Sequence, residues 1–135
     1  MTKERLRRYL WLKQEREQIV QKMQEIEATI YFPKIQRMTG MPGSGNKEGN
    51  PQEPLTIQHI ELRDLYLAKT KELLTELLSI ERAIESVTEP RHRTLLRHRY
   101  IEGLKWEEIC VAMGYEWSQI HRLHGEALAM LRVED

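Results

Sequence analysis

Polar side chains that can hydrogen-bond to nucleic-acid bases gather near the C-terminal end of the chain. They are Ser118, Gln119, His121 and Arg122, and Gly125 follows them. An arginine guanidinium can pair bidentately with guanine, and a glutamine amide with adenine, at the base edges of a DNA groove. A glycine lets its backbone approach a ligand closely. These five positions are therefore candidates for DNA contact.

The spacing of these residues predicts which of them share a face of a helix. With Ile120 at zero and about 100° per residue, Ser118, Arg122 and Gly125 fall on the opposite side, with Gln119 and His121 on the flanks. Apolar residues and one histidine occupy the inward side: Ile120, Leu123, His124, Ala127 and Leu131. We expect packing roles for His124 and for Trp117 at the core edge.

Arginines form a second group of candidates, Arg91, Arg93 and Arg97. Such side chains can hold a nucleic-acid backbone through its phosphates. They can equally pair with the acidic helix that precedes them or with an acidic protein partner. Both interpretations remain open on the sequence.

Catalysis and metal binding find no support in the residue pattern. Cys110, His121 and His124 could suggest zinc, but the histidines point to different faces and a fourth ligand is missing. Ser44 and Ser118 have no convincing histidine and acid partners. We expect no enzymatic activity, no metal and no cofactor.

The base-contact candidates lie in a predicted helix-turn-helix. A short helix over Trp106–Met113 is followed by the Gly114-Tyr115 turn and a longer amphipathic helix over Trp117–Leu131. A further helix over Arg91–Ile101 precedes them, with Pro90 in its first turn. In a helix-turn-helix the second helix can enter the DNA major groove.

The N-terminal part predicts two long helices. Residues 1–38 contain the first, 39–55 form a Gly/Pro-rich flexible linker, and 56–88 form the second, with Thr56 as its N-cap. The helix-turn-helix domain occupies 90–135. Heptad-like apolar stripes and opposite charges favour an antiparallel, coiled-coil-like arm. Surplus leucines on the second helix, Leu67, Leu74 and Leu78, suggest that it packs against the C-terminal domain or another subunit.

Composition restricts the class of protein. The chain has 135 residues, zero net charge and one cysteine, so binding to nucleic acid would need a local basic face and no intrachain disulfide can form. No apolar run is long enough to span a membrane, and the basic N-terminus develops no apolar signal-peptide core. We expect an all-α, soluble intracellular protein.

The C-terminal 40 or so residues resemble region four of bacterial sigma factors. The similarity lies in Arg99-Tyr100-Ile101, Gly103-Leu104, Trp106 to Ile109, Gly114, Ile120, Arg122 and Ala127-Leu128. One departure is Glu116, where sigma-like helices usually carry a Ser or Thr cap. Glu116 is a weaker cap and would repel phosphate, so Ser118 could start the helix instead.

The wider layout of long helix, linker, long helix and IHRLHGEAL helix is similar to ArpU/RinA-like regulators of phages and prophages. That resemblance implies a transcription regulator, most simply an activator, of late or lysis-related genes. It would bind double-stranded DNA as a homodimer through the arm, or with help from RNA polymerase. One alternative is a phage small terminase subunit that recognises packaging-site DNA. Another is a sigma-like module that binds RNA polymerase and no DNA.

Overall fold

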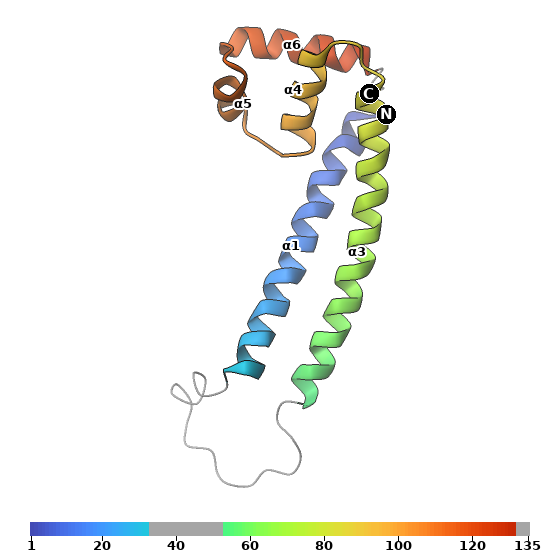
Figure 1. Cartoon of the computed structure of the whole chain (residues 1–135), viewed down its shortest axis with the longest axis vertical. Coiled ribbons are helices and arrows are strands. Elements are labelled where there is room, and N and C mark those ends of the chain that lie inside the picture. The colour runs from blue at the N-terminus through green and yellow to red at the C-terminus, as the bar shows by residue number, and fades with distance from the viewer. Residues whose placement is uncertain (33–52, 132–135) are drawn as a thin grey trace. The chain divides into compact units, whose positions relative to one another are not determined.

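Every regular element in the described part of the chain is an α-helix, and no strand forms there. The computed structural model describes residues 1–32 and 53–131. The helices are α1 (Lys3–Tyr31), α3 (Glu53–Glu85), α4 (Pro90–Tyr100), α5 (Trp106–Met113) and α6 (Trp117–Met130) (Figure 1). The prediction of an all-α fold is confirmed, and none of these helices is long and apolar enough to cross a membrane.

The chain divides into two compact units, and each of the long helices contributes to both. The first unit contains Met1–Lys13 and the chain from Glu72 onward, and the second contains Gln14–Lys71. The start of α1 and the end of α3 therefore belong with the C-terminal helices, so this unit exceeds the predicted 90–135 domain.

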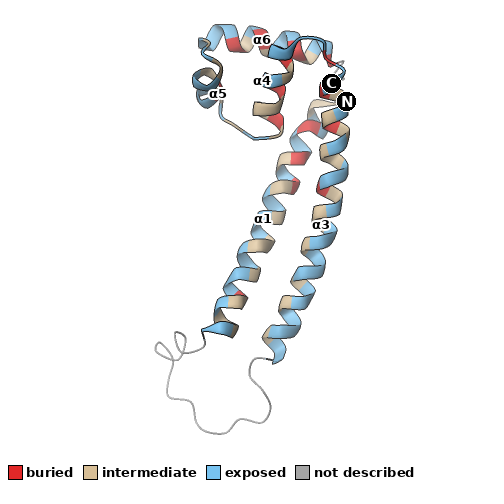
Figure 2. Cartoon of the chain, viewed as in Figure 1, coloured by how far each residue is buried: buried red, intermediate tan, exposed pale blue. Residues whose placement is uncertain are grey.

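The core of the first unit joins both long helices to α4 and α6. The buried residues of this core are red in Figure 2, and they come from α1, α3 and the helices after them. They are Leu6, Tyr9, Leu12, Leu73, Ile80, Ile84, Val87, Leu96, Tyr100, Ala127 and Leu131. The predicted inward stripes of α1, α3 and α6 supply most of them. Burial of these apolar side chains stabilises the arrangement.

In the second unit, the remainder of α1 pairs with the beginning of α3. Glu15 accepts from Lys69 at 3.2 Å, and Glu27 contacts His59 at 2.8 Å. Residue numbers rise along α1 as their partners' numbers fall along α3, so this pair is antiparallel, as predicted. Ile26 is the buried residue of the apolar stripe here.

A second core holds the helix-turn-helix together. Leu95, Ile109, Ile120 and Leu123 are buried in it. Helix α5 ends at Gly114, whose φ of 69° is left-handed and whose N–H donates to the Cys110 carbonyl at 2.9 Å. Glycine adopts this conformation without the Cβ clash that other residues meet. The two helices of the motif begin and end within one residue of their predicted bounds.

Helix α3 begins earlier than predicted. It starts at Glu53, so Thr56 lies inside the helix and the prediction of Thr56 as N-cap is wrong. The reason is Pro54, because proline has the φ that a first helical turn needs and no N–H is required there. Residues 53–55 are thus helical, and the rest of the predicted 39–55 linker lies outside the described residues.

Candidate nucleic-acid interface

Helix α6 begins directly after Glu116, the expected weak cap. Glu116 has extended backbone, with φ −78° and ψ 163°, and its carbonyl accepts from the Ile120 N–H at 3.0 Å. The Glu116 N–H donates to Oε1 of Gln119 at 3.0 Å. This is the reverse half of a capping box. Of the two starts that the sequence left open, Glu116 and Ser118, the structure has the helix beginning after Glu116, where Gln119 caps it from the first turn.

The outward face of α6 carries the central base-contact candidates. Ser118, Gln119, Arg122 and Gly125 are all exposed. Arg122 makes no hydrogen bond or ion pair with the described part of the chain, so its guanidinium is available to a ligand. Gln119 uses its amide oxygen in the cap, which leaves the amide N–H groups for an acceptor. A Cβ built on Gly125 would meet no atom within 4 Å.

His121 lies apart from that face, in a cluster of aromatic rings. Its ring centroid is 4.9 Å from the centroid of Trp106 and 4.4 Å from that of Trp117. Its Nε2 is buried without a hydrogen-bond partner in the described part of the chain. Trp117 contacts the His121 ring but is 52% exposed, so it is less buried than expected. The structure thus groups His121 with the packing residues.

His124 lies on the inward side of α6, as predicted. Its Nε2 lies 2.8 Å from the Tyr100 hydroxyl, and its ring centroid lies 4.7 Å from that of Trp106. Burial, and secondarily the nearby positive charge of Arg99, lowers the pKa of His124 to about 4. This histidine is neutral at physiological pH.

Two of the arginines predicted to contact phosphate are bound within the molecule. Arg93 donates through Nη1 to the Val87 carbonyl at 2.7 Å, near the end of α3. Arg97 pairs with Glu81 at 2.9 Å and also with Glu85. The sequence left open whether Arg97 contacts phosphate or pairs with carboxylates. In the structure it pairs with carboxylates of α3, the acidic helix that precedes it.

Arg91 occupies a more open position at the start of α4. Its Nη2 lies 3.1 Å from Oε2 of Glu89, and the side chain is 59% exposed. The Tyr115 hydroxyl and then Glu89 raise the pKa of Arg91. Its guanidinium thus has local partners yet remains accessible to a phosphate.

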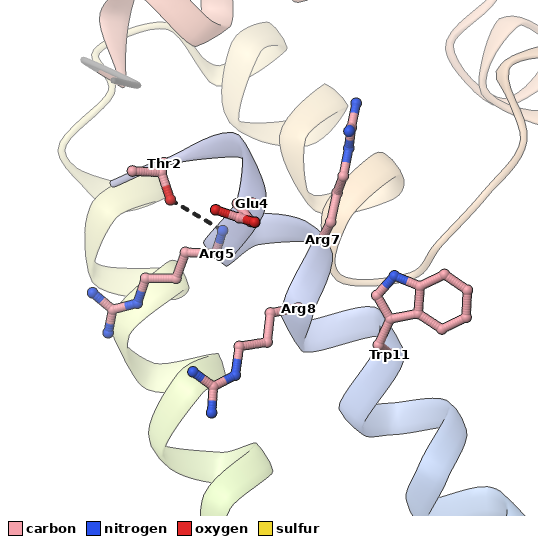
Figure 3. A pocket seen from close by; sticks show the side chains of 6 residues that line it. All are labelled: Thr2, Glu4, Arg5, Arg7, Arg8 and Trp11. Carbon is pink, nitrogen blue, oxygen red and sulfur yellow. Dashed lines mark hydrogen bonds between the residues drawn. The ribbon is translucent and has the colours of Figure 1, made fainter. Parts of the chain in front are cut away.

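The first turns of α1 direct their arginines to two sides. Arg5 and Arg8 point toward α3, whereas Arg7 points away from it (Figure 3). Arg5 pairs with Glu76 at 3.2 Å, and Arg8 pairs with Glu72 at 3.1 Å. Arg7 makes no hydrogen bond or ion pair with the described residues. Two of the three arginines in these first turns therefore join α1 to α3.

A cationic cavity of about 220 Å³ lies beside Arg7. The guanidinium of Arg99 lies 4.4 Å from the Trp106 ring centroid and donates to the Leu104 carbonyl at 3.0 Å. No carboxylate occurs among its lining residues, which are Arg7, Leu10, Arg99, Tyr100, Gly103, Trp106 and His124. Arg7 and Arg99 are thus further candidates for phosphate contact. Sequence spacing could not find this pair because its members are far apart in the chain.

The potential zinc ligands do not form a cluster in the described part of the chain. No group of three or more His, Cys, Asp or Glu side chains suited to a metal occurs among those residues. Cys110 is half-buried and packs against the helix-turn-helix core.

Comparison with known proteins places most of these elements in one family. The model of the family described as "Protein of unknown function (DUF1492)" matches residues 44–132, well over half of the chain. That range includes all of α3 to α6. No curated protein and no solved structure matches the chain.

Proposed function

The chain belongs to the DUF1492 family, and we propose that it binds specific sequences of double-stranded DNA and regulates transcription without being an enzyme. The observation that carries this proposal is the outward face of α6. Arg122 is exposed there and has no hydrogen bond or ion pair with the described residues, whereas Ile120 and Leu123 on the opposite side of the same helix are buried. The helix therefore presents an exposed guanidinium to the solvent.

The proposed mechanism is docking of α6 in the major groove. Base contacts in this motif come from the N-terminal part of the second helix, which here contains Ser118, Gln119 and Arg122. Arg122 would donate two hydrogen bonds to guanine, and the Gln119 amide N–H groups would donate to a base acceptor. Gly125 would let the α6 backbone come close to the DNA. Arg91, Arg7 and Arg99 would supply phosphate contacts.

The biological setting comes from the family resemblances in the sequence. An ArpU/RinA-like regulator with a sigma-like helix-turn-helix would act in the bacterial cytoplasm on phage or prophage promoters. It would most simply activate late or lysis-related genes. One helix-turn-helix binds DNA weakly, so the protein would act as a homodimer or together with RNA polymerase.

A second candidate function is a sigma-like module that binds RNA polymerase and not DNA. Two observations favour it. Arg93 and Arg97 are used inside the molecule, which reduces the positive charge available to phosphates. Glu116 is exposed at the start of α6, where a phosphate would approach. A small terminase subunit remains a third candidate, and a closed ring of many subunits in solution would support it.

The decisive experiment is selection of bound sequences from random duplex DNA, followed by titration of the selected duplex with Arg122→Ala. We expect the wild-type protein to enrich one sequence. Loss of the guanine contact should weaken binding of that sequence by roughly tenfold to a hundredfold and relax its specificity. The helical circular-dichroism spectrum should not change, because Arg122 is exposed and has no hydrogen bond or ion pair in the described part of the chain.

Arg82→Ala is the matched control, since it removes the same charge from an exposed position on α3. It should leave the affinity for the selected duplex nearly unchanged. If the wild-type protein enriches no sequence and shows no salt-sensitive retention of any phage promoter fragment, DNA binding is refuted. A polymerase pull-down would then test the second candidate.

A further inference from the structure

The face of α3 turned away from α1 carries an exposed stripe of seven residues. Its members are spaced by alternating steps of three and four, the spacing of a coiled-coil seam. All seven are exposed: Ile57, Ile60, Asp64, Leu67, Lys71, Leu74 and Leu78. Each of the five apolar side chains is between 51% and 55% exposed, so none of them packs in the core of its own chain.

The order of charged and apolar positions is the same on both sides of Leu67, and their distances from Leu67 match to within one residue. The charges on the two sides are opposite. Ile60 and Leu74 lie seven residues on either side of Leu67, and Ile57 and Leu78 lie ten and eleven away. Asp64 is three residues before Leu67, and Lys71 is four residues after it. A second copy that runs in the opposite direction would therefore set apolar residues against apolar residues.

The two charges decide between an antiparallel and a parallel pairing. With a two-fold axis at Leu67, Asp64 of each copy would lie beside Lys71 of the other, which is favourable. In a parallel pairing, Asp64 would face Asp64 and Lys71 would face Lys71. Like charges directly opposite in a seam are unfavourable, and charged seam positions fix register and orientation at some cost in stability.

We propose that the Ile57–Leu78 face of α3 binds a second copy of this chain, antiparallel, with the two-fold axis at Leu67. The homodimer is part of the proposed function, on which this inference rests, and the Ile57–Leu78 face would be its interface. Its apolar and charged positions are self-complementary, as a two-fold interface must be. Ala68, directly beside Leu67, is small enough to let the two helices approach closely.

The first test measures the mass of the full-length protein in solution, without DNA, by sedimentation equilibrium. We expect a dimer for the wild type and a monomer for Leu67→Glu at the same concentration. Val111→Glu is the control, because Val111 is 84% exposed on α5 and lies outside the stripe. Circular dichroism verifies that both variants remain helical. A monomeric wild type, or a dimeric Leu67→Glu variant, would overturn the proposal while leaving DNA binding by α6 standing.

The second test reverses the charges. Asp64→Lys should raise the dimer dissociation constant at least tenfold, because it sets two lysines beside each other on either side of the axis. The double variant Asp64→Lys with Lys71→Asp should recover most of the wild-type affinity. No recovery, or no effect of the single change, would contradict the antiparallel arrangement.

The third test uses disulfide formation between copies, in a Cys110→Ser background with an added oxidant. Leu67→Cys should cross-link to itself, because this position lies at the axis. Leu74→Cys alone should not, but it should cross-link to an Ile60→Cys copy in a mixture. Ready self-cross-linking of Leu74→Cys would show a parallel pairing instead and would refute the proposal.

Discussion

Gly125 is a residue at which folding and binding make opposite demands. It lies in the interior of α6 with open space around it, and glycine in a helix interior costs about 0.5–1 kcal/mol relative to alanine. We expect Gly125→Ala to raise the free energy of unfolding by about that amount in urea titrations. The same methyl group should weaken binding of the selected duplex, since it stands on the outward face between α6 and the DNA.

Gly114 supplies the matched comparison. Its φ is 69°, so Gly114→Ala should lower the free energy of unfolding by about 1–2 kcal/mol. A Gly125→Ala variant that binds the selected duplex as tightly as the wild type would show that the α6 backbone does not approach the DNA there.

His124 gives the stability of the fold a dependence on pH. Its pKa is lowered from 6.5 to about 4 in the folded protein, where it lies among Tyr100, Trp106, Arg99 and His121. Between these two pH values the unfolded chain binds a proton that the folded protein does not, so stability falls as the pH drops through this window. Below about pH 4 this contribution should level off.

The measurement is urea unfolding at several pH values for wild type and His124→Phe, which keeps a ring against Trp106. The difference between the unfolding free energies of the two proteins at each pH isolates the contribution of His124 from that of carboxylates that titrate in the same pH range. We expect the variant to lose stability less steeply between pH 6.5 and 4. Parallel curves for wild type and His124→Phe would contradict the assignment.

At the residue scale, the sequence could predict faces but not partners. Helical spacing placed Arg122 outward and His124 inward, and the structure agrees with both. It could not predict that Arg97 is bound to Glu81, because that contact depends on where α3 lies beside α4. Helical spacing likewise placed His121 on the flank of the outward face, because spacing does not show which rings lie beside it. In the structure, the rings of Trp106 and Trp117 contact the His121 ring.

At the element scale, the ion pairs of Arg97 hold α4 against the end of α3. Its guanidinium is about one-third exposed and meets two carboxylates. We expect Arg97→Ala to lower the free energy of unfolding by about 1 kcal/mol, the upper end of the range for ion pairs that solvent still screens. Binding of the selected duplex should stay within a factor of about two, because the side chain faces α3 and not the solvent.

Chemical denaturation and duplex titration of the same Arg97→Ala sample test these two expectations together. The exposed Arg82→Ala variant again provides the comparison for lost charge. Weakened DNA binding with unchanged stability would assign Arg97 to phosphate contact after all, as one of the two interpretations of the sequence held.

Helix boundaries were predictable where the chain carries strong local signals. Gly114 ends α5 and Pro90 begins α4, and both positions follow from backbone geometry alone. The start of α3 was missed because Thr56 is a good cap in isolation. Pro54 and Glu53 extend the helix in front of it. A proline can either end the helix before it or lie in the first turn of a new one, so Pro54 alone did not fix the start of α3.

At the scale of the whole molecule, the division into two units changes what the long helices do. The ends of α1 and α3 form one core with the helix-turn-helix, since Leu6 and Ile84 are buried together with Leu96. This could not be read from helical periodicity, which treats each stripe alike along its length. The sequence did predict the excess of leucine on α3, because the helix has more apolar residues than one partner can cover.

The two-fold pairing proposed for the Ile57–Leu78 stripe also has a consequence for the DNA sequence that the protein would recognise. Two copies related by a two-fold axis would present their α6 helices in opposite orientations along a duplex. Whatever bases one copy reads, its companion would read on the complementary strand. The operator should therefore be an inverted repeat. A DNA site that contains only one half of the inverted repeat should be occupied only at protein concentrations well above those that saturate the complete repeat.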